Sequence, residues 1–316
     1  MALPYQWQYR LDRWKATLQG FFGGGGNQQP RPKLCPNCGS LVGINATRCH
    51  NCGTNLRFSM AAVNRGLSGV FSGVFSGPAP VTTALLVANL LMFGVEWMAS
   101  AAQGQGGGLS ILGGMSGQST VRLGMSWPYG IYVQHEWYRL ITAMFLHGGL
   151  IHIGFNMMAL MQLGPALEEL YGSSRYFFLF ILTGAFGFLV SSFPYGPWYP
   201  NNSLGASGGL LGLVGAMLAI TTKRGGAYMR ELRSRLVSSV VILFVLGFLG
   251  MGLDNKAHMA GLASGFVLGK IFADRQPMNA RERQIANALG WLAAIAVIAS
   301  FAFMILHYRD PIPGQA

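Results

Sequence analysis

The sequence predicts an all-α membrane protein that crosses the bilayer several times. Of its 316 residues, 51% are hydrophobic and only 10% are charged, whereas a soluble domain carries about 25% charged residues. The apolar residues gather in runs that reach, or nearly reach, the roughly 20 residues that a helix needs to span the hydrocarbon core. None of these runs alternates as the strands of a membrane barrel do. Seven runs are expected to be helices, at about 80–102, 141–165, 174–194, 206–222, 236–251, 256–273 and 285–307.

The basic residues predict the orientation of these helices. The net charge is +12, but 18 of the 22 Lys and Arg precede residue 79 or lie in every second loop. Only Arg122, Arg139, Lys256 and Arg309 lie on the other side. This is the positive-inside pattern, which places the N-terminus in the cytoplasm and the C-terminus outside. Membrane topology therefore accounts for the charge, and nucleic acid binding is not expected. Because no organelle-targeting segment is apparent, we expect a prokaryotic plasma membrane.

All four cysteines lie in two closely spaced pairs before the first apolar run. Cys35 and Cys38 form one C-x-x-C pair, and Cys49 and Cys52 form the other. This spacing predicts a zinc ribbon, in which four thiolates hold a structural Zn²⁺ with no open coordination position. Two disulfides or a redox pair are the alternatives, and a cytoplasmic location disfavours the disulfides. His50 is surplus to the four ligands, and the ribbon is a candidate binding site for a cytoplasmic partner.

Composition changes along the chain predict five parts. A Gly-rich linker precedes the cysteines, and a Gly/Ser/Phe-rich linker follows them. We expect an N-terminal segment and linker over 1–30, the zinc ribbon over 31–57, a linker over 58–78, the seven-helix domain over 79–307 and a tail over 308–316.

Five polar side chains lie near the outer ends of three predicted spans. Polar groups are costly within a membrane, so they indicate function by default. A serine next to a histidine base is an activated nucleophile, whereas a lone histidine on an apolar helix is more often a structural hydrogen-bond donor. Convergence of five such groups at one depth predicts a shared catalytic site. The five are His147, His152 and Asn156 in the second span, Ser207 in the fourth and His258 in the sixth.

Glycines in the fourth and sixth spans predict close packing of these two helices. Gly261 and Gly265 follow His258 by three and seven residues, so they share its helix face. Small residues at this spacing allow transmembrane backbones to approach closely. Such packing would bring His258 within reach of Ser207.

These motifs resemble those of the rhomboid intramembrane serine proteases. The resemblance rests on Trp137-Tyr138-Arg139, on His147, His152 and Asn156, on Gly205-Ala206-Ser207-Gly208, and on Ala257-His258 followed by Gly261 and Gly265. It implies a rhomboid-like core of six helices with one extra C-terminal transmembrane helix. The zinc ribbon lies outside this core.

The resemblance also implies a mechanism. Ser207 would be the nucleophile, and His258 would be the general base and then the general acid. His152, Asn156 and the Ser207 backbone N–H would form the oxyanion hole. Trp137 and Arg139 would hold the first external loop in the membrane interface, with Glu96 as a candidate partner of Arg139.

Two further positions bear on the histidine. Many relatives carry a tyrosine, packed on the catalytic histidine, where this chain has Leu211, and we expect Leu211 to pack there. Asp254 lies one turn before His258, and we interpret it as a polar loop residue.

The sequence therefore predicts an intramembrane serine endopeptidase that needs no cofactor for catalysis. Its substrates would be transmembrane segments of other membrane proteins, cut near the outer face of the lipid bilayer. The main alternative is an inactive rhomboid-like protein that binds membrane proteins or serves in their quality control. A transporter is a third possibility, but no charged residue is convincingly placed at mid-span.

Overall fold

The chain divides into two compact units, Met1–Phe71 and Ser72–Ala316. In the first unit, β1 (Lys33–Leu34) pairs antiparallel with β2 (Leu41–Val42). The four cysteines of the predicted ribbon lie outside the described residues. The computed structural model describes residues 33–34, 41–42, 51, 79–104, 114–193, 202–250, 252–272 and 274–310.

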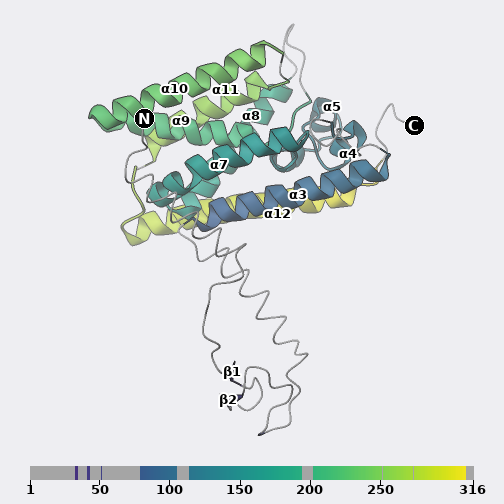
Figure 1. The fold of residues 1–316 in the computed structure, drawn as a ribbon, viewed down its shortest axis with the longest axis horizontal. Coiled ribbons are helices and arrows are strands. Elements are labelled where there is room, and N and C mark those ends of the chain that lie inside the picture. The colour runs from purple at the N-terminus through teal and green to yellow at the C-terminus, as the bar shows by residue number, and fades with distance from the viewer. Residues whose placement is uncertain are drawn as a thin grey trace. The chain divides into compact units, whose positions relative to one another are not determined.

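The second unit is a bundle of long helices, drawn in Figure 1. Within its described residues, short helices precede α7, and seven helices have 17 or more residues. The short ones are α4 (Gly117–Arg122), α5 (Pro128–Tyr132), α6 (Arg139–Thr142) and η2 (Ala143–Phe145). The long ones are α3 (Pro80–Ala102), α7 (Leu150–Tyr171), α8 (Ser173–Ser192), α9 (Ser207–Lys223), α10 (Ala227–Phe248), α11 (Asn255–Ile271) and α12 (Ala280–His307).

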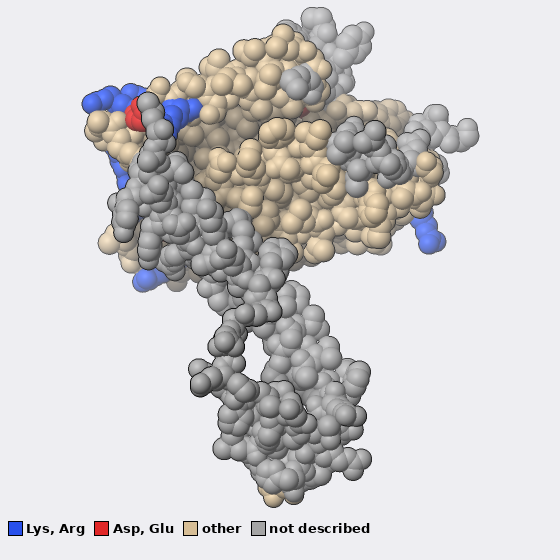
Figure 2. Space-filling view, viewed as in Figure 1, with Lys and Arg blue, Asp and Glu red and all other residues tan. Residues whose placement is uncertain are grey.

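Four of these helices, α3, α7, α8 and α12, are long and apolar enough to cross a membrane. Helix α9 is apolar but shorter. The first half of helix α10 contains Arg230, Arg233 and Arg235. Helix α11 has only 17 residues. A topology of seven spans therefore stays a prediction. In Figure 2, Lys and Arg gather mainly at one end of the helical unit, while its side is almost free of charge.

Local chemistry sets where the helices begin and end. Pro80 begins α3, and the Glu168 carboxylate accepts hydrogen bonds from the N–H groups of Val81 and Thr82 at 2.9 and 2.8 Å. These bonds satisfy donors that have no partner within the helix. Gly172 follows the last residue of α7, and its φ of +79° is a conformation that glycine adopts without strain. Asp254 caps the N-terminus of α11, because its side chain accepts a hydrogen bond from the N–H of Ala257 at 3.1 Å.

The predicted second span differs from the structure at its start. Helix α7 begins at Leu150 rather than near residue 141, because Gly148 and Gly149 interrupt the helical backbone. His147 consequently lies in the turn before α7 and not on it. This turn becomes important for the site.

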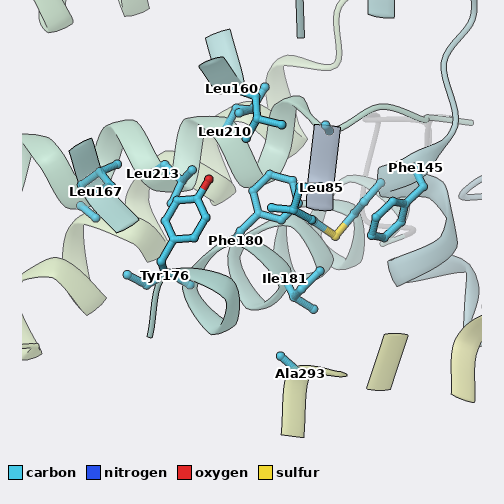
Figure 3. Close-up of a cluster of buried hydrophobic side chains, with 14 of the residues drawn as sticks. Leu85, Phe145, Leu160, Leu167, Tyr176, Phe180, Ile181, Leu210, Leu213 and Ala293 are labelled. Atoms are coloured by element: carbon cyan, nitrogen blue, oxygen red, sulfur yellow. The ribbon is translucent and has the colours of Figure 1, made fainter. Parts of the chain in front are cut away.

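Helix α9 lies at the centre of the bundle and packs against α7, α8, α10 and α11. The core beside it is aromatic and aliphatic, and Figure 3 shows Tyr176 and Phe180 of α8 close to Leu210 and Leu213 of α9. All four side chains are buried. The helix that begins with Ser207 is thus enclosed on several sides.

Candidate active site

Ser207 and His258 meet in the structure. Ser207 is the first residue of α9, and His258 lies in the first turn of α11. The His258 Nε2 and Ser207 Oγ atoms are 2.8 Å apart, which is hydrogen-bond distance. His258 is buried, whereas Ser207 is partly exposed. A hydroxyl that contacts an imidazole in this way can transfer its proton to the ring during nucleophilic attack.

Glycines allow the two helices to come this close. A Cβ atom added to Gly261 would collide with the carbonyl oxygen of Gly208, and one added to Gly265 would collide with that of Gly212. At Gly269 the added atom would lie 2.7 Å from the Ala216 Cα. Backbone therefore meets backbone along the whole contact between α9 and α11, as the glycine spacing predicts.

His152 lies on α7 and faces the chain just before Ser207. Its Nδ1 accepts a hydrogen bond from the N–H of Gly148 at 3.3 Å. A neutral ring that accepts at Nδ1 carries its proton on Nε2. A Cβ added to Gly205 would lie 2.8 Å from both Cε1 and Nε2 of His152, and Gly205 has a φ of +122°. Only glycine fits here, because both the space and the backbone conformation exclude a side chain.

The other two predicted oxyanion donors are placed differently. The Ser207 N–H belongs to the first turn of α9, whose donors have no acceptor within the helix. Asn156 is buried one turn beyond His152, and its amide Nδ2 donates to the His152 carbonyl oxygen at 2.9 Å. One of the two N–H donors of this amide is thus used within its own helix, and the other is left for a further acceptor.

The surroundings of His258 include one residue that the sequence did not reveal. The Phe244 ring of α10 lies edge-on to the His258 ring, with ring centroids 6.5 Å apart. Leu211 is buried on α9, and its packing against His258 stays a prediction. No local pattern marks Phe244, because it comes from a separate helix.

Asp254 serves as a helix cap. Besides its bond from Ala257, its carboxylate accepts a hydrogen bond from the Ser191 hydroxyl at 2.5 Å. Among the described residues, the His258 Nδ1 has no hydrogen-bond partner. Within the described part of the chain, an acidic side chain is therefore not hydrogen-bonded to the His258 ring.

Arg139 organises the segment between α3 and α7. Its Nε lies 2.6 Å from the Glu136 carboxylate, and its Nη1 donates to the carbonyl oxygens of Val121 and Met125 at 2.6 and 3.2 Å. Arg139 is only 5% exposed. The Tyr138 hydroxyl also donates to Glu136, and burial raises the pKa of this phenol.

The other half of the predicted tryptophan–arginine motif lies near the surface. Trp137 is 48% exposed, and its ring meets Tyr132 edge-to-face with centroids 5.5 Å apart. Arg139 therefore holds the fold of the segment, while Trp137 remains available to the membrane interface.

Backbone hydrogen bonds connect the segment between α3 and α7 to the chain before Ser207. Ser126 and Ser203 exchange two backbone hydrogen bonds of 3.0 Å each. The Gly205 N–H donates to the Ala143 carbonyl oxygen at 2.8 Å. The segment that Arg139 stabilises therefore also fixes the approach to Ser207.

Glu96 is not the partner of Arg139, so that prediction is wrong. Arg139 pairs with Glu136, which is three residues away in the sequence. Glu96 lies fully buried on α3, and its Oε2 accepts a hydrogen bond from the N–H of His147 at 2.9 Å. The pairing of Arg139 is local, so a distant carboxylate was not needed.

Comparison with known proteins identifies the family. The model of the Rhomboid domain matches residues 134–275, which contain His147, His152, Asn156, Ser207 and His258. The chain is 33% identical over 218 residues to RHOMBOID-like protein 6, mitochondrial, of Arabidopsis thaliana, and this match covers 62% of the chain and 68% of the relative. The chain belongs to the rhomboid family.

Two bacterial relatives are named as rhomboid proteases. The chain is 32% identical over 196 residues to rhomboid protease GluP of Bacillus subtilis, covering 62% of the chain but only 35% of the relative. It is 29% identical over 222 residues to rhomboid protease GlpG of an Enterobacter species, covering 67% and 69%. These rhomboid relatives support a rhomboid-type serine protease, and with the apolar helices they support an integral membrane protein.

Replacement of Arg139 tests how the segment between α3 and α7 is held. Arg139→Ala would leave the buried Glu136 carboxylate without its positively charged partner. Such a change typically costs about 3–5 kcal/mol of stability. Arg235→Ala is the matched control, because its ion pair with Glu231 is exposed on α10 and such pairs contribute at most about 1 kcal/mol. Unfolding measured in detergent should show a large decrease in the free energy of unfolding for Arg139→Ala only. Equal losses would contradict the role of Arg139.

Proposed function

We propose that this chain is an intramembrane serine endopeptidase that uses Ser207 and His258 as a catalytic dyad. The observation that carries the proposal is the 2.8 Å contact between Ser207 Oγ and His258 Nε2. Two relatives named as rhomboid proteases support it. The chemistry requires only side chains, backbone N–H groups and water.

In the proposed reaction, the Ser207 Oγ attacks a peptide carbonyl carbon while His258 Nε2 takes the hydroxyl proton. The negative charge that develops on the carbonyl oxygen is stabilised by the Ser207 N–H and by His152. Asn156 would join them through the second N–H of its amide, the first being bonded to the His152 carbonyl oxygen. His258 then gives the proton to the leaving amine, and water releases the acyl group by the same steps.

The substrates we propose are transmembrane segments of membrane proteins, cut near the outer face. The distribution of basic residues supports this placement, because it puts the Ser207 end of α9 outside and the Lys223 end inside. It also supports a cytoplasmic N-terminus and an outer C-terminus. The membrane we propose is a prokaryotic plasma membrane. Water then reaches the site from the outside.

Active-site labelling tests the dyad. A fluorophosphonate probe, applied to the purified full-length protein in detergent, should label the wild type and not Ser207→Ala. His258→Ala should be labelled far more slowly, because the hydroxyl loses its base. Ser264→Ala is the control, because its hydroxyl bonds to the Ala260 carbonyl oxygen of its own helix at 2.8 Å. A folded wild type that stays unlabelled would favour the inactive, substrate-binding alternative.

We also propose that Cys35, Cys38, Cys49 and Cys52 hold a structural Zn²⁺. Four thiolates match the tetrahedral preference of this ion, which would stabilise the fold of the ribbon. The pairing of β1 with β2, in register Leu34 with Leu41, supports this proposal, because Cys35 and Cys38 belong to the connection between the strands. Within the described ranges no metal-binding cluster occurs elsewhere.

Metal analysis of the full-length protein tests the ribbon. Mass spectrometry of metals should find a single zinc ion per chain, and the double variant Cys35→Ser, Cys38→Ser should lose it. His50→Ala should keep the zinc, because His50 is surplus to the four thiolates. An unchanged zinc content in the double cysteine variant would contradict the proposal. Loss of zinc that leaves fluorophosphonate labelling intact would agree with a site separate from catalysis.

A further inference from the structure

Glu96 is a buried carboxyl group that the proposed mechanism does not use. Its side chain on α3 has no exposed surface, and its Oε2 accepts one hydrogen bond from the N–H of His147. Among the described residues its Oε1 has no partner. Burying a carboxyl group with so few hydrogen bonds is costly. The bond from the His147 N–H is the hydrogen bond of this carboxyl group that an apolar side chain at this position would lack.

The backbone that Glu96 contacts leads directly to His152. The next N–H along the chain is that of Gly148, and it donates to the His152 Nδ1 at 3.3 Å. The His147 ring, fully buried in the same turn, lies edge-on to the His152 ring with centroids 5.1 Å apart. The two N–H groups belong to adjacent planar peptide units that are joined only through the φ and ψ angles of His147. The Glu96 bond on one side and the buried His147 ring on the other limit the rotation about these two angles.

The direction of the Gly148 N–H decides which nitrogen of His152 carries the proton. With Nδ1 accepting, the neutral imidazole donates from Nε2. That side of the ring faces Gly205, two residues before Ser207. The opposite tautomer would present a lone pair to the same place, and a lone pair cannot stabilise an oxyanion.

We propose that Glu96 is a positioning residue that selects the His152 tautomer through the turn at His147 and Gly148. The inference concerns the oxyanion hole, so its consequence for activity rests on the proposed function. The position of the proton on His152 does not depend on the proposed function. It can be measured whether or not the protein is an active protease.

The first test is the ¹⁵N spectrum of the histidine rings in the full-length protein in detergent. The His152 signals are assigned by their loss in His152→Ala. In the wild type, Nε2 should carry the proton, and Glu96→Gln should keep this state because its amide oxygen can still accept from His147. Glu96→Leu should give a mixture of tautomers. An unchanged His152 spectrum in a folded Glu96→Leu protein would overturn the proposal.

A matched control separates this effect from a general loss of stability. Asn89 lies two turns earlier on the same face of α3, is also fully buried, and bonds to the Leu85 carbonyl oxygen of its own helix. Asn89→Leu should leave the His152 tautomer unchanged even if the protein becomes less stable. A tautomer change of equal size in this variant would show that any disturbance of α3 suffices, and would overturn the specific role of Glu96.

The second test is a double-mutant cycle on the rate of labelling by a fluorophosphonate. Loss of one oxyanion donor costs about 10²–10³-fold in rate, and His152→Ala sets the limit for Glu96→Leu. If Glu96 acts through His152, Glu96→Leu should slow labelling in the wild type and cause no further loss in the His152→Ala background. If the two substitutions reduced the labelling rate independently, so that their effects multiplied in the double variant, the coupling would be overturned. A folded wild type that is not labelled would count against the proposed function instead, and the ¹⁵N spectrum would still decide the tautomer.

Discussion

The close approach of α9 and α11 is the constraint on which the candidate site depends. A 2.8 Å contact between Ser207 and His258 requires the beginnings of two helices to lie within the reach of two short side chains. Gly261 and Gly265 provide this, because each faces a carbonyl oxygen of α9 where a methyl group would not fit. Packing in a membrane relies on such fitting of surfaces more than on the hydrophobic effect. The same glycines therefore serve both stability and the geometry of the pair.

A second layer holds the groups around this pair. Arg139 bonds to Glu136 and to two carbonyl oxygens of the segment between α3 and α7. That segment bonds to the chain before Ser207 through Ala143. On the other side, Glu96 of α3 contacts the turn that precedes His152. Donors fixed in advance stabilise a developing charge without having to reorganise during the reaction. Three buried charged residues, Glu96, Glu136 and Arg139, thus contact each other or backbone that leads to the site.

The sequence predicted the features that depend on local spacing. The apolar runs, the glycines three and seven residues after His258 and the order of the polar residues all follow from periodicity, and the family match agrees with them. It could not predict contacts that depend on how separate helices meet. Phe244 beside His258 and the bonds from Ser126 and Gly205 have no local signature. The partner of Glu96 was predicted wrongly because a buried carboxylate suggests an arginine, whereas here it accepts from a backbone N–H.

The rate of fluorophosphonate labelling in Gly261→Ala tests most directly whether the helix contact creates the dyad. The added methyl group would meet the Gly208 carbonyl oxygen, one turn from His258. Displacement of a reacting group by about 1 Å can cost about 10²-fold in rate, so a slowing of that order is expected. Gly94→Ala on α3 is the control, because nothing lies within 4 Å of the added atom, and it should react as the wild type does. A folded Gly261→Ala protein that is labelled at the wild-type rate would contradict the account.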